Sequence, residues 1–260
     1  MTDTRVRLDI DGPIAVITND NPVKHNAFDD AMDERLFDIL GELRRRTDVR
    51  AVVWRGEGRS FSSGRDVGAI GGRQVELSHH ELMRRGHRGI QQLFDLDAPV
   101  IVAHKGWSIG GSFQRALLCD IRIAAEGARF MLPEVGHGVI PDTGGVGRLF
   151  QICGPGVASD LVLTGRPMDV AEAYAHGIVS RVLPPDDLDE TVLDMARRIA
   201  AAPAVTVKMA RRVIAHLAEP EIRSSMDDEL IAQTFINRSD DYAEMRAARA
   251  EDRAPVYTGS

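Results

Sequence analysis

Two short runs of alternating apolar and polar residues open the chain. The runs, 6–10 and 14–16, lie on either side of the dipeptide Asp11-Gly12. Alternation with a period of two around an Asp-Gly pair is typical of two strands joined by a tight turn. The chain is therefore predicted to begin with a β-hairpin.

The pattern then switches between helical and strand spacing. Apolar positions from Phe28 to Arg46 recur every three or four residues, and the continuous apolar run 51–54 follows them. Such spacing predicts an amphipathic helix, and the short apolar run predicts a buried strand. The same alternation continues with a helix at 79–96, a strand at 99–103, a helix after Gly111 and a strand at 121–125. This order predicts an α/β fold.

Beyond Gly144 the spacing is mostly helical. A short strand is expected at 178–183, and the other segments have helical patterns: 157–164, 170–175, 188–201, 205–217, 220–236 and 240–251. Neither a repeat of fixed period nor a long linker interrupts the chain. We predict a core over residues 1–197 and a helical C-terminal region over 198–260, with the break near residues 195–203.

Composition narrows the class of protein. The 260 residues are 43% hydrophobic and 27% charged, with a net charge of −7. Because no basic block stands out, a nucleic-acid partner is not expected. An apolar leader and a run of roughly 20 apolar residues are both absent, which predicts a cytoplasmic protein that does not enter membranes. Cys119 and Cys153 lack metal-ligand spacing, so free thiols and no metal are expected.

The candidate chemistry lies in three motifs. An apolar strand, Pro99 to His104, leads into Gly110-Gly111 and then into a helix. Free amides and the positive end of the helix dipole should converge there, which favours an oxygen that gains negative charge. Two carboxylates follow, in Pro133-Glu134 and in Pro141-Asp142. The pattern predicts an oxyanion hole that faces one or two acids.

The motifs together resemble the crotonase (enoyl-CoA hydratase/isomerase) family, in order and over nearly the whole chain. They are Asn21–Ala27, Phe61–Asp66, Gly110-Gly111, Cys119-Asp120, Pro133-Glu134, Pro141–Gly145 and Leu163–Gly165. The resemblance implies a spiral of ββα repeats with a C-terminal helical trimerisation region. It also implies an acyl-CoA substrate and a homotrimer or dimer of trimers, with no cofactor beyond the substrate's own CoA.

The resemblance also assigns roles to residues. The backbone N–H groups of Arg65 and Gly111 would hold the thioester oxygen. The CoA nucleotide would lie against Lys24, His25, Ala27, Ser63, Arg65, Val67 and Tyr257. Tyr257 belongs to a basic and aromatic C-terminal stretch, which either reaches a CoA site or forms a disordered tail.

The carboxylates decide between reactions. Hydratases of the family use two glutamates, and the first position is here Gln114, which cannot accept a proton. Glu134 occupies the second position, and its pKa should rise in an apolar pocket. Asp142 is either a second acid, as in some isomerases of the family, or the cap of a helix that starts near Gly144. Asp66 and Asp120 are expected to be structural.

Three functions follow from these residues. The favoured one is an isomerase that shifts a C=C bond of an enoyl-CoA through an enolate, because one carboxylate can both remove and return a proton. The alternatives are a hydratase or C–C bond hydrolase on the same scaffold, and a non-catalytic acyl-CoA binder. The acyl group stays open, since Met83, His87, Phe94, Phe113 and Met131 either shape its pocket or belong to the core.

Overall fold

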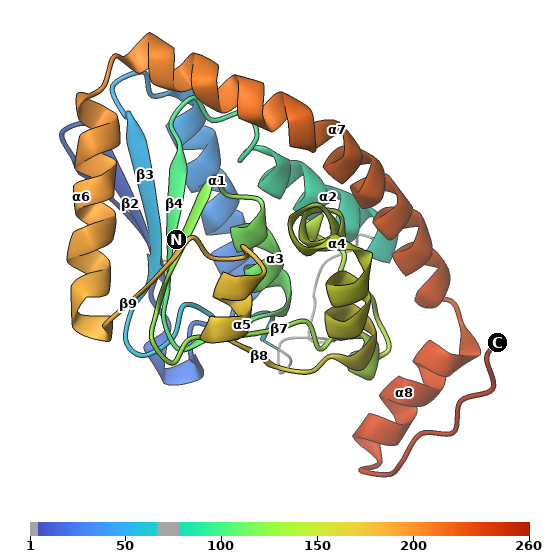
Figure 1. Cartoon of the computed structure of the whole chain (residues 1–260). Coiled ribbons are helices and arrows are strands. Elements are labelled where there is room, and N and C mark those ends of the chain that lie inside the picture. Colours follow the sequence, from blue (N-terminus) through green and yellow to red (C-terminus); the bar gives the residue numbers. More distant parts are fainter. Residues whose placement is uncertain (1–4, 67–77) are drawn as a thin grey trace.

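The computed structural model describes residues 5–66 and 78–260 and contains two sheets with helices around them (Figure 1). The larger sheet has the strand order β1-β2-β3-β4-β6-β9, with β1 antiparallel to β2 and all later neighbours parallel. Its strands are β1 (Val6–Asp11), β2 (Ile14–Asn19), β3 (Ala51–Gly56), β4 (Val100–His104), β6 (Ile121–Ala125) and β9 (Arg181–Leu183). The predicted α/β class and opening hairpin are confirmed.

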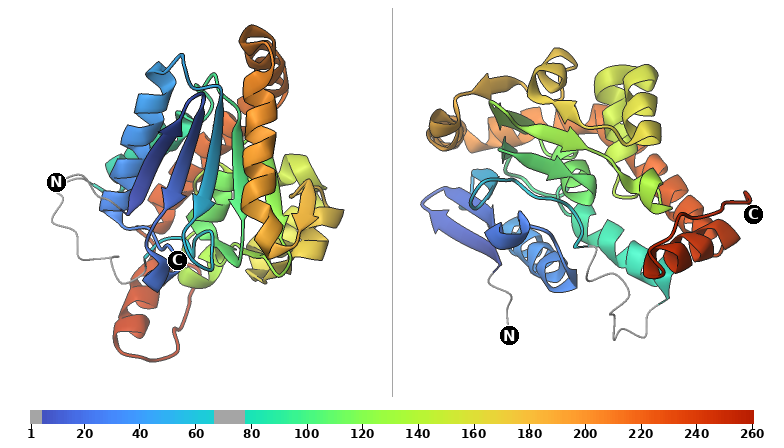
Figure 2. Two further views of the ribbon diagram at one scale, coloured as in Figure 1. Left: turned by 90° about the vertical axis from the view of Figure 1, so that its left-hand side faces the viewer. Right: turned by 90° about the horizontal axis from the view of Figure 1, so that it is seen from below.

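Helices cover both faces of this sheet. Alternate residues of the strands face α1 (Asp30–Arg45) on one side and α6 (Leu188–Ala201) on the other, and Figure 2 shows these helices on opposite sides. Trp54 of β3 lies in the cluster with α1, whereas its neighbour Val53 lies in the cluster with α6. The sheet is therefore buried on both faces, which explains why its strands read as continuous apolar runs.

A second, smaller sheet was not predicted from the sequence. It consists of β5 (Trp107–Ile109), β7 (Arg129–Met131) and β8 (Met168–Asp169). These strands are two or three residues long, too short to show a period. With α3 (Gly110–Leu117), α4 (Gly145–Thr164) and α5 (Val170–Ala175) they enclose a second apolar cluster. Because β5 runs directly into α3, this sheet positions the predicted glycine pair.

The C-terminal helices differ from the prediction at one residue. The expected helices 205–217 and 220–236 form a single helix, α7 (Ala204–Ile236), with Pro220 inside it. Pro220 has no backbone N–H, so the carbonyl of His216, four residues earlier, has no donor within the helix. Both residues are exposed, so water can satisfy that carbonyl. Arg211 before the proline and Ile222 after it are buried, which holds both halves in place. α7 arches across the molecule, and α8 (Asp240–Ala250) follows it (Figure 1).

Two other boundaries are shorter than predicted. α2 (His79–Gln91) ends before residue 96 because the amides of residues 93–95 donate to carbonyls three residues earlier, which tightens the chain into turns. The strand expected at 178–183 is reduced to β9, since the amides of Ile178 and Val179 donate to Ala173 at the end of α5. The remaining short helices are η1 (Pro22–Lys24), η3 (Glu134–His137) and η4 (Pro185–Asp187).

The turn between α6 and α7 falls at Ala202 and Pro203, inside the interval expected for the break, while the division at 197/198 itself stays a prediction.

Within the described ranges, every helix falls short of the length or apolar content that a membrane crossing requires.

Candidate active site

A cavity of about 540 Å³ lies among α1, α2, α3, the segment 139–143 and the C-terminal helices α7 and α8. Arg65, Gly111, Gln114, Glu134 and Asp142 all line it. These five residues come from four separate motifs of the chain, so the fold brings together the oxyanion-hole and acidic residues that were predicted.

The predicted oxyanion-hole residues both have an available amide. Phe28 N–H donates to the Gly64 carbonyl and Asp66 N–H donates to the Phe28 carbonyl, each over 2.8 Å. In such a parallel bridge the amide of the middle residue, Arg65, points away from the partner segment. Gly111 lies in the first turn of α3, whose amides have no acceptor within the helix. Within the described residues, both N–H groups are therefore available to a ligand oxygen.

Gly64 is required for the close approach of the two segments that carry these amides, the segment at Arg65 and the start of α3. Its φ is +85°, and a Cβ atom there would come within 2.7 Å of the Ile109 carbonyl oxygen. A larger residue would therefore force the segment at Arg65 away from the start of α3.

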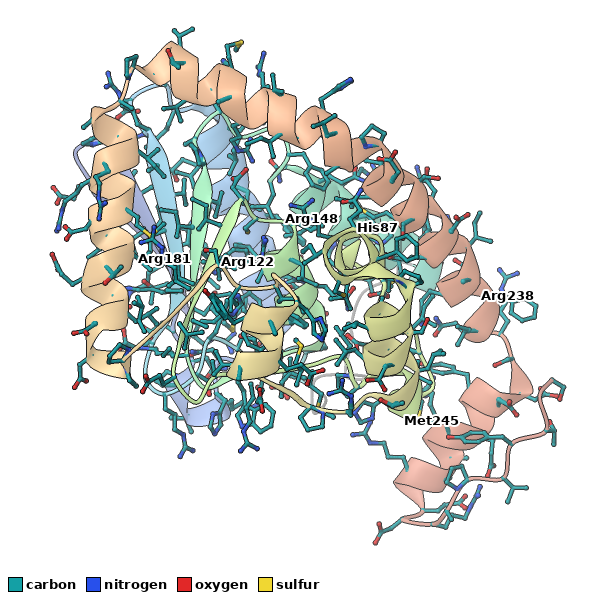
Figure 3. The ribbon with its side chains drawn as sticks, in the orientation of Figure 1. His87, Arg122, Arg148, Arg181, Arg238 and Met245 are labelled. Atoms are coloured by element: carbon teal, nitrogen blue, oxygen red, sulfur yellow. The ribbon has the colours of Figure 1, made fainter. Side chains whose placement is uncertain are left out.

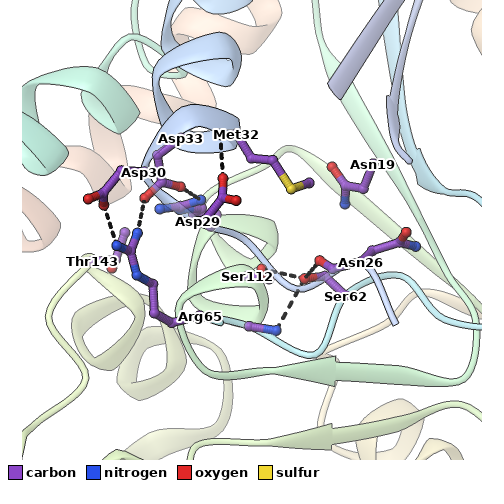
Figure 4. A network of polar contacts seen from close by, with 12 residues as sticks. Asn19, Asn26, Asp29, Asp30, Met32, Asp33, Ser62, Arg65, Ser112 and Thr143 are labelled. Atoms are coloured by element: carbon purple, nitrogen blue, oxygen red, sulfur yellow. Dashed lines mark hydrogen bonds and ion pairs between the residues drawn. The ribbon is translucent and has the colours of Figure 1, made fainter. Parts of the chain in front are cut away.

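A buried pair of serine hydroxyl groups connects these two segments. Ser62 Oγ donates to the Asn26 carbonyl over 2.6 Å and accepts from Gly64 N–H over 3.1 Å. Ser112 Oγ lies 2.8 Å from Ser62 Oγ and must be the donor, since the Ser62 hydrogen is already used (Figure 4). The serine pair links the segment before Arg65 to the helix turn that contains Gly111.

Gln114 connects both acid motifs. Its Nε2 donates to Glu134 Oε1 over 2.8 Å, and its Oε1 accepts from Thr143 N–H over 2.8 Å. The side chain is buried, so both hydrogen bonds are shielded from water. A glutamate here would place a second carboxylate against Glu134 and would lose the donor.

Glu134 has the properties of a proton carrier. Burial raises its pKa to about 7, with a further increase from nearby Asp142, while the hydrogen bond from Gln114 opposes the shift. Its Oε2 is buried and has no hydrogen-bond partner in the part of the chain that the structure describes. A carboxyl group with a pKa near neutrality can both accept and return a proton.

Asp142 lies beside the arginines of the cavity. Burial raises its pKa to about 6, opposed chiefly by Arg115 and more weakly by Arg65. The cap interpretation is wrong, because the N-cap residue of α4 is Gly144 and Asp142 forms no side-chain cap hydrogen bond there. His87 instead bonds the Asp142 carbonyl through its Nε2. Asp142 is thus placed as a cavity residue, and its catalytic role stays a prediction.

Two residues of α7 that the sequence analysis missed hold the segment around Asp142. Glu229 Oε2 accepts from Gly144 N–H over 2.7 Å, and Gln233 Oε1 accepts from Ile140 N–H over 3.1 Å. Both side chains are buried, and burial raises the pKa of Glu229 to about 8. Their signal in the sequence is two polar residues one turn apart on the buried face of a helix.

The predicted CoA residues near η1 lie together beside Arg65. Ser63 Oγ donates to the Lys24 carbonyl over 3.0 Å, and His25 Nδ1 lies 2.8 Å from Ser60 Oγ. Lys24 Nζ forms a 2.6 Å ion pair with Asp66 and is largely exposed, and Ala27 is buried next to this loop. Val67 lies outside the described residues.

Tyr257 is not brought to the cavity of its own chain. Its side chain is 52% exposed, and the neighbouring Val256 N–H donates to Glu244 of α8 over 2.8 Å. Figure 3 shows Met245 on the same helix, and its side chain lies against Gly138. α8 therefore contacts the segment that follows Glu134, while the tail beyond it lies on the outer surface.

The residues considered for an acyl pocket divide into two groups. Met83 and His87 line the cavity, whereas Phe113 is fully buried in the second apolar cluster and Phe94 packs against the first. Met131 is part of β7. Asp120 accepts from Val100 N–H and from the Arg211 guanidinium, which confirms its structural role.

The α/β fold thus places two available backbone amides and two buried carboxyl groups around one cavity. Comparison with known proteins identifies the family to which this arrangement belongs. Residues 9–260 match the family model described as enoyl-CoA hydratase/isomerase. The chain belongs to this family, the crotonase family.

Individual relatives agree over the whole length. The chain is 33% identical to a carnitinyl-CoA dehydratase of Salmonella typhi over 253 residues, which cover 95% of this chain and 96% of that protein. An enoyl-CoA hydratase/isomerase structure from Pseudoalteromonas atlantica T6c superposes with a TM-score of 0.88 at 26% identity, covering 98% and 100% of the two chains. A structure from Magnetospirillum magneticum, described as an enoyl-CoA hydratase/carnithine racemase, gives a TM-score of 0.77 at 28% identity, with 99% and 97% covered. Together with the C-terminal helices, these similarities confirm the predicted fold.

Proposed function

We propose that this enzyme is an enoyl-CoA isomerase that moves a C=C bond into conjugation with the thioester. The observation that carries the proposal is the hydrogen bond from Gln114 Nε2 to Glu134 Oε1. Gln114 occupies the place of an acid in the family's hydratases and donates to Glu134, so Glu134 serves as the proton carrier of the proposed reaction. Proton transfer between two carbons requires only one such group.

The reaction follows from the positions of these groups. The Arg65 and Gly111 amides bind the thioester oxygen, and ionised Glu134 removes a proton from C2 of a 3-enoyl-CoA. The C2–H electron pair forms the dienolate, whose oxygen charge the two amides stabilise. Glu134 then returns the proton to C4, so the double bond moves from C3–C4 to C2–C3. Asp142 assists from the cavity wall, and the CoA nucleotide binds along Lys24, His25, Ala27 and Ser63, next to Val67.

A second candidate is reversible water addition on the same scaffold. Two observations favour it: a relative at 33% identity is named a carnitinyl-CoA dehydratase, and Asp142 supplies a second carboxyl group on the cavity. In this reaction Asp142 would activate water while Glu134 protonates C2. A C–C bond hydrolase would use the same enolate with a 1,3-dicarbonyl substrate.

The products separate these reactions. The purified enzyme is incubated with 2-enoyl-CoA and 3-enoyl-CoA substrates of several chain lengths, and the products are identified by mass spectrometry. An equal-mass product that disappears in Glu134→Gln supports the isomerase, whereas a product heavier by one water supports the hydratase. Arg181→Gln, an exposed change on β9, is the matched control and should leave turnover unchanged. Tight binding without any turnover would mean a non-catalytic acyl-CoA binder.

A further inference from the structure

An ion network forms one wall of the cavity. The Arg65 guanidinium contacts Asp30 and donates to Asp33 Oδ2 over 2.9 Å, and Arg115 Nη1 lies 2.7 Å from Asp33 Oδ1. Figure 4 shows Arg65 directed toward Asp30 and Asp33 at the start of α1. All four side chains line the cavity. Of the predicted CoA contacts Arg65 lines the cavity, whereas Lys24, His25, Ala27 and Ser63 are not among its described lining, which favours the acyl part of a substrate as the occupant of this cavity.

One N–H group of Arg115, at Nε, has no hydrogen-bond acceptor among the described residues. Its side chain is only 12% exposed, and its guanidinium carbon lies 5.2 Å from the Phe28 ring centre and 5.9 Å from that of Phe37. The two aromatic rings and Asp33 hold the group in place. Its Nε is buried and makes no hydrogen bond within the described residues. A buried charged donor of this kind is stabilised when a ligand supplies an acceptor.

The positive charge of Arg115 favours a ligand oxygen over a ligand cation at this wall of the cavity. Asp33 is shared with Arg65, and the other acids that line the cavity are Asp30, Glu134 and Asp142. Arg246 of α8 also lines the cavity, and within residues 5–66 and 78–260 it makes no ion pair. A cation placed directly against Arg115 would be repelled by its guanidinium, whereas a ligand oxygen at the same place would be attracted by it.

We propose that the acyl group of the substrate bears an oxygen acceptor at its far end, a carboxylate in the strongest form, which accepts a hydrogen bond from Arg115. This inference rests on the proposed function, since it assigns the acyl part of an acyl-CoA to this cavity. A plain hydrocarbon chain would exclude water from the network and leave the Arg115 donor unpaired. Arg115 is thus a specificity-determining residue.

Wild-type enzyme tests the proposal with three enoyl-CoA substrates of equal length, which end in a methyl group, a carboxylate or a trimethylammonium group. Disappearance of substrate is measured, so the result does not depend on which product forms. We expect kcat/KM for the carboxylate substrate to exceed that for the methyl-terminated substrate by about tenfold or more, as hydrogen bonds to charged groups allow. An equal or higher kcat/KM for the methyl or trimethylammonium substrate would overturn the proposal.

Variants then assign the preference to Arg115. Arg115→Met keeps the apolar stem of the side chain and removes the guanidinium, and it should lower the ratio of kcat/KM for the carboxylate substrate to that for the methyl substrate about tenfold. Arg85→Met is the matched control, because Arg85 lines the same cavity but donates to Glu34 over 2.8 Å. A similar loss of preference in both variants would contradict a specific role for Arg115. Circular dichroism checks the folding of each variant, and the wild-type substrate series stands regardless of that result.

Failure of the proposed function would look different. If none of the substrates were converted, the enzymatic proposal would fail, and dissociation constants of the same three esters would be measured by calorimetry. Tighter binding of the carboxylate ester by about tenfold would still support the Arg115 inference, and equal binding would overturn it.

Discussion

The carboxyl group of Glu134 has an unusual pKa. Burial raises this pKa to about 7, well above the ordinary value of 4.5. As a base it acts only when ionised. We therefore expect kcat to rise with pH through about 7 and to level off above it. A pH profile of isomerisation measures this, and a plateau that already begins near pH 5 would contradict the assigned base.

The same shift predicts a pH dependence of stability. The folded state keeps the Glu134 proton up to about pH 7, whereas the unfolded chain loses it near 4.5. Folding therefore binds a proton in this window, so the free energy of unfolding falls as pH rises from about 4.5 to about 7. Glu134→Gln should remove up to about 3 kcal/mol of this fall. Urea unfolding of the wild type and Glu134→Gln at pH 5 and pH 8 measures how much the free energy of unfolding falls between these pH values. An equal fall in the two proteins would argue against the raised pKa.

Gln114 is the residue that sets the proposed reaction type. Gln114→Glu would place a carboxyl group at the position from which Nε2 now donates to Glu134 over 2.8 Å. Two acids so close share a proton, and the ionised member can activate water. We expect the ratio of water addition to bond shift to rise about tenfold or more. Gln114→Leu removes the hydrogen bonds without adding an acid, and an equal ratio in the two variants would refute this role.

At the scale of elements, α7 connects the C-terminal region to the site. Glu229 accepts from Gly144 N–H, and the next turn provides Gln233 for Ile140 N–H. Glu229→Leu should release this segment and lower kcat by about tenfold or more with little change in KM, because a misplaced catalytic group affects the chemical step.

Two further variants control this prediction. Glu229→Gln keeps an oxygen acceptor for Gly144 N–H and should retain most of the activity. Glu221→Leu changes an exposed glutamate on the same helix and should have no effect. Equal losses in Glu229→Gln and Glu229→Leu would contradict the role assigned to this hydrogen bond.

At the scale of the whole molecule, α7 exposes an apolar surface to solvent. Val205, Val213, Ile214 and Leu217 are each more than half exposed. A patch of this kind favours burial against another subunit. We propose that it contributes to the homotrimer or dimer of trimers implied by the family resemblance, and that Tyr257 reaches a CoA site only in that assembly.

The assembly is tested by sedimentation of the wild type and of Ile214→Asp/Leu217→Asp. We expect a trimer or hexamer for the wild type and a smaller species for the double variant, because two buried charges oppose association. Asp substitution of Tyr174, an exposed residue on α5, serves as a control away from α7. A monomeric wild type would exclude the proposal.

How far the sequence leads differs between the elements and the site. The opening hairpin, α1, β3, β4 and α3 follow from local spacing, and the glycine pair and Glu134 stand in short motifs that fold locally. The three short strands of the second sheet and the continuity of α7 through Pro220 do not follow from local spacing, because each depends on packing against distant segments.

The sequence by itself determined the α/β class and the family, and it provided the prediction of the oxyanion-hole and acid residues, because each of those motifs lies within a few residues of the chain. Only the tertiary structure decided that Gln114 donates to Glu134, that Glu229 holds the segment at Gly144, and that Arg115 lies in the cavity wall against Asp33. The physical reason is that these contacts join residues far apart in the chain, and periodicity records only which side of an element is buried, not what it meets.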